Sequence, residues 1–262
     1  MGAFGILRTL RAWLGALALP ALVACGPSPP PVAAPAVPAP PHCQSYSPSQ
    51  VLQLDLMAQL NWIDEEIATC RKDPAATAED YKLRGTISVE LPGRGPELAI
   101  DDFTDALALM PDDAQAYLGR ARAKIALGRY ADALPDLNKA IELAPDAAAY
   151  ANRAGAYQAM GDPEAAIADM TRSIELAPER AKSYESRGLL YGRIGEVDEA
   201  MADIAKAIDL DPSRALAWQA ALQKLGYYAG PQNGQFDSAT KSALRRWLVD
   251  RMPGLTKTDS SN

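Results

Sequence analysis

A repeat with a period of about 34 residues constrains what this chain can fold into more than any other feature. Glycines and prolines recur at that spacing between residues 114 and 212, at Gly128, Gly161, Gly195 and at Pro145, Pro178, Pro212. Each unit holds two runs of apolar residues with helical periodicity, and the glycine separates the two runs. Each unit is therefore predicted to be a helix-turn-helix, and stacked units of this kind bury a continuous core.

Aromatic, small and large apolar residues also recur at fixed offsets in these units: Tyr117, Tyr150, Tyr184; Ala133, Ala166, Ala200; Leu137, Met170, Ile204. This pattern resembles the tetratricopeptide repeat (TPR). A fourth matching unit lies upstream, with Tyr81, Gly85 and Phe103 in phase and two extra residues in its turn. The resemblance implies an all-α fold: a solenoid of about four TPR-like helix-turn-helix repeats over residues 78–214.

The resemblance also implies a binding groove formed by the first helices of the repeats, which would hold a peptide or a segment of a partner protein. The corresponding residues are Leu118, Arg122, Ile125, Ala151, Gly155, Gln158, Glu185, Leu189 and Arg193. The paired Lys and Asn of the carboxylate-clamp subtype are absent from this set, so we expect an apolar or extended peptide as the ligand. The alternative is a groove closed by the terminal segments of the chain itself.

The repeats depart from the TPR pattern at one position, where Arg replaces the usual Leu three residues after the aromatic residue. An Asp on the predicted second helix follows each Arg after sixteen residues, or eighteen in the unit with the longer turn. The predicted pairs are Arg84 and Asp102, Arg120 and Asp136, Arg153 and Asp169, and Arg187 and Asp203. We interpret them as partly buried ion pairs that set the register of the two helices. The alternative is that the charges are independently solvated; catalysis would not need four copies.

The first 24 residues have the features of an export signal: Arg8 and Arg11 are followed by an apolar stretch too short to span a bilayer stably. The stretch ends in Leu-Val-Ala before Cys25, which resembles the lipobox of bacterial lipoproteins. The resemblance implies that residues 1–24 are removed and that Cys25 carries lipid, which anchors the chain to a membrane. Gly26, in place of Asp, weakly favours the outer membrane. The alternative is an ordinary signal peptide.

Residues 25–46 read as the lipidated cysteine and a linker rich in Pro and Ala, a composition that favours extended polyproline II. If Cys25 carries lipid, Cys43 and Cys70 remain as an even pair in an oxidising compartment, and we predict a disulfide between them. Two free thiols are the alternative. Residues 47–77 hold a predicted helix, 49–71, with an apolar stripe, which we expect to cap the exposed end of the repeat stack.

Residues 215–250 resemble the small helical peptidoglycan-binding domain of cell-wall proteins. The matching motif comprises Gly226, Tyr227, Tyr228, Gly230, Asn233, Gly234, Phe236, Thr240 and Trp247. Asn233 replaces an Asp of the family pattern, and Leu248 replaces a Gln. The resemblance implies glycan binding, in which an exposed Tyr227 or Tyr228 would stack on a sugar; the alternative is a solenoid cap that has lost the ligand. Residues 251–262 are predicted to be a flexible tail.

Charge and residue content exclude several classes of function. The net charge of −7 and the lack of a basic cluster argue against nucleic-acid binding. The chain has one histidine, His42, and no recognisable catalytic set, metal-ligand spacing or phosphate loop, so we expect no enzymatic activity, metal or cofactor. The sequence thus predicts a lipid-anchored scaffold that faces the periplasm, binds a protein and contacts peptidoglycan. The alternative is an adaptor for envelope enzymes or assembly machinery without peptidoglycan binding.

Overall fold

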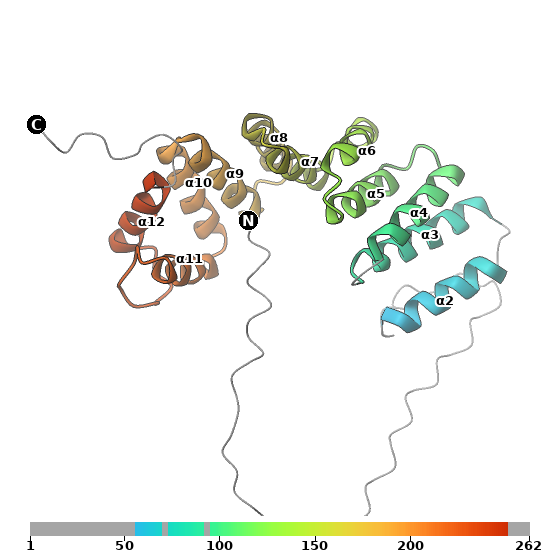
Figure 1. Ribbon diagram of the computed structural model, residues 1–262, viewed down its shortest axis with the longest axis horizontal. Coiled ribbons are helices and arrows are strands. Elements are labelled where there is room, and N and C mark those ends of the chain that lie inside the picture. The colour runs from blue at the N-terminus through green and yellow to red at the C-terminus, as the bar shows by residue number, and fades with distance from the viewer. Residues whose placement is uncertain (1–55, 70–72, 92–94, 251–262) are drawn as a thin grey trace, which may run out of the picture. The chain divides into compact units, whose positions relative to one another are not determined.

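The computed structural model describes residues 56–69, 73–91 and 95–250, and all regular elements in these ranges are α-helices (Figure 1). The helices are α2 (Leu56–Thr69), α3 (Pro74–Val89), α4 (Gly95–Leu109), α5 (Ala114–Ala126), α6 (Tyr130–Leu143), α7 (Ala147–Met160), α8 (Pro163–Leu176), α9 (Ala181–Ile194), α10 (Val197–Leu210), α11 (Ser213–Lys224) and α12 (Ser238–Asp250). The all-α prediction is confirmed.

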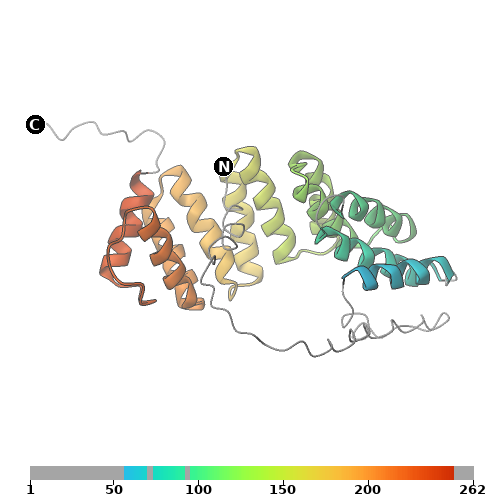
Figure 2. The same ribbon diagram turned by 60° about the horizontal axis from the view of Figure 1, so that its bottom comes forward.

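Helices α3 to α10 form four helical hairpins that stack in chain order, so that each hairpin packs on the next (Figure 2). The small residues expected between the two helices of a unit, Ala133, Ala166 and Ala200, are completely buried. The turn glycines Gly128, Gly161 and Gly195 have φ of +74°, +87° and +93°, a conformation that other residues adopt at a cost. The helix-turn-helix solenoid predicted from the repeat is therefore confirmed.

Helix α2 packs on α3 and covers the first face of the stack. Its side chains Trp62, Ile63 and Ile67 are buried in a cluster with Tyr81 and Phe103. The predicted capping segment, 47–77, runs past the start of α3, because the Asp73 side chain accepts a hydrogen bond from Ala75 N and caps α3 at Pro74. The cap is thus one helix, and the first hairpin begins a few residues earlier than expected.

Helices α11 and α12 share one apolar core with the last hairpin and do not form a separate domain. Helix α12 packs on α9, α10 and α11. A Cβ atom on Gly192 of α9 would lie 2.6 Å from Leu248 Cδ2, so the Leu248 side chain would have to shift to admit any larger residue there. The C-terminal unit is therefore fixed to the repeat stack through side chains of α12.

Several expectations concern residues outside the described ranges: the signal 1–24, the lipidated Cys25, the linker, the pair Cys43 and Cys70, and the tail 251–262. They stay predictions. In the described part of the chain, no helix is long and apolar enough to cross a membrane.

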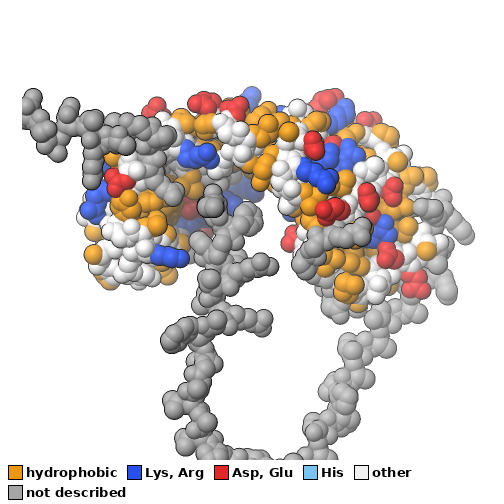
Figure 3. All heavy atoms as spheres, viewed as in Figure 1, with side chains coloured by type: hydrophobic (Ala, Val, Ile, Leu, Met, Phe, Trp, Pro, Cys, Tyr) orange, Lys and Arg blue, Asp and Glu red, His pale blue; other side chains and the backbone are white. Residues whose placement is uncertain are grey.

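Acidic and basic side chains are interspersed over the repeat helices on the face drawn in Figure 3.

Candidate functional site

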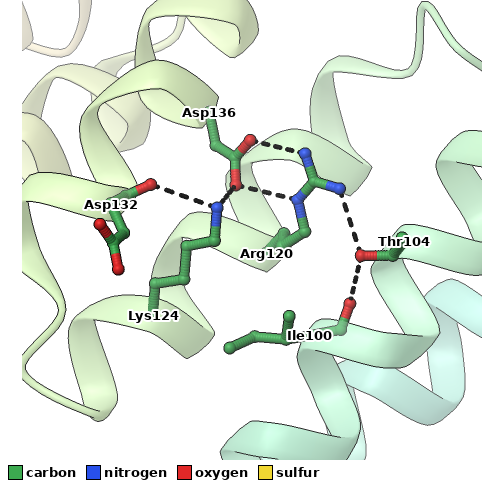
Figure 4. Close-up of polar contacts among 6 residues, drawn as sticks. All are labelled: Ile100, Thr104, Arg120, Lys124, Asp132 and Asp136. Carbon is green, nitrogen blue, oxygen red and sulfur yellow. Dashed lines mark hydrogen bonds and ion pairs between the residues drawn. The ribbon is translucent and has the colours of Figure 1, made fainter.

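The four predicted Arg–Asp pairs are all in direct contact, one pair in each hairpin. Arg120 Nε and Nη2 donate to the two carboxylate oxygens of Asp136 at 2.9 and 2.7 Å (Figure 4). Arg153 and Arg187 make the same bidentate contact with Asp169 and Asp203, at 2.7 to 2.9 Å. In the first hairpin both Arg84 bonds go to one oxygen of Asp102, at 3.0 and 2.6 Å. Each pair thus joins the two helices of its own hairpin.

Each arginine also reaches the helix that precedes its own hairpin, a contact that the sequence analysis missed. Nη1 of Arg120, Arg153 and Arg187 donates to Thr104, Asn138 and Thr171, on the second helix of the hairpin before, at 3.2, 2.7 and 3.0 Å. Nη1 of Arg84 binds Asp64 of α2 instead, at 2.6 Å. The aromatic residue three positions earlier stacks on each guanidinium, at 5.4 to 5.9 Å from ring centroid to Cζ. We call this series of contacts the arginine ladder.

The electrostatics of the ladder differ between its first two steps. Burial alone would raise the pKa of Asp136, but hydrogen bonds from Arg120 and from Lys124, the latter at 2.7 Å, hold it below its usual value. Burial raises the pKa of Asp102 above its usual value in spite of the bond from Arg84. In the hairpin next to the N-terminal cap, the charge of Arg84 therefore does not offset the burial of Asp102.

The predicted groove residues have three different environments. Leu118 is buried in the core, so it does not line an open surface as expected. Glu185 pairs with Arg214 of α11, and Leu189 packs against the core of the C-terminal unit. The remaining groove residues are exposed or half-buried, at Arg122, Ile125, Ala151, Gly155, Gln158 and Arg193. The last repeat thus uses part of the predicted surface to hold the chain's own C-terminal helices, which matches the alternative at that end only.

An open pocket of about 230 Å³ lies between α7 and α9. Ala148, Ala151 and Met170 give it an apolar lining, and its polar residues are Asn152, Arg180, Lys182, Ser183 and Ser186. Asn152 Nδ2 donates to Ala148 O at 2.8 Å, so the side-chain oxygen of Asn152 is left for other partners. Within the described ranges, Arg180 and Lys182 form no ion pair, and both are exposed. Of the predicted groove residues, only Ala151 lines this pocket.

The C-terminal motif is organised by Gln219, a completely buried residue of α11 that the sequence analysis missed. Its Nε2 donates to Asn233 Oδ1 and Gln235 O, both at 2.8 Å, and its Oε1 accepts from Gly234 N at 2.8 Å. Asp237 Oδ1 accepts a hydrogen bond from Thr240 N at 2.8 Å, and this side chain caps α12. A polar residue on the apolar side of a predicted helix, between Ala215 and Leu222, was the available signal.

The aromatic residues of the motif are mostly structural. Tyr228 is buried and its hydroxyl donates to Pro231 O at 3.0 Å, so the expectation that it is exposed for stacking is wrong. Trp247 is buried edge-on against Trp218, with ring centroids 5.6 Å apart. Tyr227 is half-buried and bonds Asp250 through its hydroxyl at 3.0 Å, while the half-buried Phe236 lies under the Lys241 ammonium at 5.3 Å. Only Tyr227 and Phe236 can offer an aromatic face to a ligand.

Two family models match this chain. The model described as "Tetratricopeptide repeat" matches residues 93–148 and 151–215. The model described as "Putative peptidoglycan binding domain" matches residues 209–249, which include the end of α10 together with α11 and α12. These two matches agree with the repeat stack and with the unit that Gln219 organises.

Parts of this chain are similar to known proteins. A 79-residue segment is 38% identical to the SGT1 homolog of Bos taurus and covers 30% of this chain and 23% of that protein. The chain spans less than a quarter of the length of the curated relatives it matches. The segment of MamA of Desulfovibrio magneticus from residue 41 to its end has a similar structure, with a TM-score of 0.56 and 24% identity over 63% of this chain and 90% of that segment. YrrB, described as a TPR protein with an unusual peptide-binding site, has a TM-score of 0.51 and 18% identity over 72% of this chain and 91% of YrrB.

Proposed function

We propose that this chain is an adaptor of the bacterial cell envelope that binds an extended segment of a partner protein. One observation carries the proposal: the pocket between α7 and α9, on a repeat scaffold of a kind that recognises protein segments. Its apolar lining suits a side chain, and its amide and hydroxyl groups suit a peptide backbone. The adjacent Gly155 is exposed, and a Cβ added to it would meet nothing within 4 Å, so packing inside the protein does not require glycine there.

The charge of the pocket favours an acidic segment. Arg180 and Lys182 supply two cations that the described part of the chain does not neutralise, although the chain as a whole is acidic. Such cations attract a carboxylate on a partner and repel a basic partner. This revises the expectation of an apolar peptide in the groove. The partner that fits best has an acidic residue near one or more apolar side chains.

Photo-crosslinking tests this function. A photoreactive amino acid in place of Ala151, in cells that produce the full chain, should give a crosslinked product with a partner protein. Lys182→Glu should abolish the product, because it reverses the charge at the pocket rim. Lys206→Glu, an exposed lysine of α10 away from the pocket, is the matched control and should leave the product unchanged. A product that survives Lys182→Glu contradicts the proposed pocket.

The envelope location and the contact with peptidoglycan are part of the same proposal. A lipid on Cys25 would hold the chain at a membrane, more consistent with the outer one, and the C-terminal unit would contact the cell wall. The family match over residues 209–249 and the half-buried Tyr227 and Phe236 support the wall contact. No step of this proposal needs catalysis, a metal or a cofactor.

A sacculus pelleting assay on residues 26–262 tests the wall contact. The protein should pellet with purified sacculi, and Phe236→Ala should weaken pelleting, because stacking of an aromatic side chain on a sugar face would be lost. Leu216→Ala, an exposed residue of α11, is the control. A truncation at Pro212 is a poor control, since it would uncover the core that α12 shares with α9 and α10. If the intact protein stays in the supernatant, the wall contact is excluded.

The second candidate function is an adaptor without wall binding, in which α11 and α12 serve as a cap. The shared core and the close contact of Gly192 with Leu248 favour this reading, since a cap needs only that packing. The two candidates differ only in the pelleting result. The pocket between α7 and α9 has the same role in both.

A further inference from the structure

The interface between the N-terminal cap α2 and helix α3 contains two buried carboxylates. Glu66 of α2 is 6% exposed and Asp80 of α3 is 8% exposed, among the apolar residues that hold the two helices together. The Glu66 Oε2 atom is fully buried and has no hydrogen-bond partner. A buried carboxylate oxygen without a partner is costly to remove from water, so the charges at this interface affect how firmly α2 docks.

The cations near this interface are already bound to other acids. Arg84 binds Asp64 of α2 and Asp102 of α4. Lys82 binds Glu79 of its own helix and Asp113, the residue that caps α5. Within the described ranges, neither Glu66 nor Asp80 forms an ion pair. By contrast, the next step of the arginine ladder gives Asp136 two cations.

The surroundings of Asp80 raise the pKa of its carboxyl group. Burial raises the pKa of Asp80, and the nearby charges of Glu66 on α2 and Glu79 on α3 act in the same direction, so that this pKa reaches about 6. No cation from α4 or α5 contributes to this shift. A group whose pKa is raised in the folded state stabilises that state below its ordinary pKa, and the stabilisation is lost as the pH rises through the raised value. The window here runs from about pH 4 to about pH 6.

We propose that the N-terminal cap is an acid-tightened latch: α2 docks more firmly on the repeat stack in mildly acidic medium, because a proton on Asp80 removes the cost of burying its charge and its repulsion from Glu66. When the proton leaves, α2 opens more often and uncovers the apolar face of α3. The buried side chains Trp62, Ile63 and Ile67 keep α2 docked most of the time, since opening exposes their apolar surface to water. The latch therefore modulates the opening of α2 and does not unfold the repeats.

Hydrogen exchange on residues 26–262 tests the latch at about pH 5 and about pH 7.5, after correction for the intrinsic exchange rate. The shift of Asp80 predicts about tenfold stronger protection of the α2 peptide at the lower pH. The α7 peptide, which carries no such acid pair, is the internal reference and should show no comparable change. Equal protection of α2 at the two pH values overturns the proposal.

Two sets of variants assign the effect to these residues. Asp80→Asn with Glu66→Gln keeps the shapes of both side chains and should abolish the pH dependence, with strong protection at both pH values. Asp101→Asn, an exposed acid of α4, is the matched control and should keep the tenfold ratio. Arg71 and Lys72 lie outside the described ranges, and replacing both by Gln should also keep the ratio. A ratio that persists in the double variant at Asp80 and Glu66, or that disappears with Arg71 and Lys72, overturns the assignment.

Discussion

The repeat stack and the C-terminal unit both bury polar side chains between helices, but they satisfy them in different ways. In the stack, Arg120 and its equivalents carry a full charge and meet a carboxylate, a hydroxyl or amide of the preceding repeat, and an aromatic face. In the C-terminal unit, the neutral amide of Gln219 donates and accepts at the same time. A repeated interface can use charge because the same geometry returns in each unit. A single irregular loop needs one side chain that can both donate to a backbone carbonyl and accept from a backbone N–H.

The ladder ends where the C-terminal unit begins. Ala205 of α10 occupies the position held by Thr104, Asn138 and Thr171 in the earlier repeats, and Ala221 of α11 occupies the position of the arginine. The contact between the last hairpin and the C-terminal helices is consequently apolar, through Trp218, Leu244 and Leu248. The comparison predicts that the loss of a contact in the arginine ladder destabilises several repeats, whereas the loss of the Gln219 contacts destabilises only the C-terminal unit.

The largest effect is expected from Arg153→Leu, which leaves the buried Asp169 without its cation. Breaking one partner of a buried pair costs about 3–5 kcal/mol, and urea denaturation of residues 26–262 should report a loss in that range. The double variant Arg153→Leu with Asp169→Leu should recover most of it, because no unpaired charge remains. Unchanged stability of Arg153→Leu would mean that the charges are solvated independently.

Gln219→Leu should have a smaller effect that is confined to one end of the molecule. It leaves Gly234 N, and other groups that Gln219 contacts, without a partner, at a cost of about 1–3 kcal/mol. Hydrogen exchange should rise in α11, α12 and the loop between them and stay constant in α5 and α6. Gln223→Leu, at an exposed position of the same helix, should change stability by less than about 0.5 kcal/mol. Uniform loss of protection throughout the chain would contradict the contrast between the two regions.

Asn138→Ala should have the smallest effect, about 0.5–1 kcal/mol, because it removes one exposed bond between repeats and leaves the Arg153–Asp169 pair in place. Asn138→Thr copies the residue found at the equivalent positions 104 and 171 and should match the parent protein. Thermal unfolding compares the two variants directly. If both lose the same stability, the bond between repeats is not the cause.

The parts that the sequence predicted well are the ones that it repeats. Each Arg and Asp occurs four times at one phase, so the pattern itself shows that the residues face each other. The contacts to Thr104, Asn138 and Thr171 use different residue types, and for that reason they are not visible as a pattern. Gln219 occurs once, and its partners lie on a loop whose path no periodicity reports.

The wrong expectation for Tyr228 has a similar cause. A tyrosine in a turn-rich segment is a reasonable candidate for exposure, but the chain reverses after Gly226, and the ring packs beside Gly230. A Cβ on Gly230 would lie 2.5 Å from the Tyr228 hydroxyl oxygen, so the glycine makes room for the buried ring. Leu118 was misplaced because the groove positions were taken from a general repeat pattern, whereas its burial depends on the side chains of the neighbouring hairpin.

The docking of α12 on the last hairpin has a mechanical consequence. If the C-terminal unit holds a wall polymer, a pulling force on it reaches α9 through the contact between Leu248 and Gly192, with no flexible joint between them. To peel α12 away, the force must expose Leu244, Trp247 and Leu248 together, each of which costs on the order of 1.5–3 kcal/mol. The repeat hairpins would then bear the tension through the side chains packed between neighbouring helices.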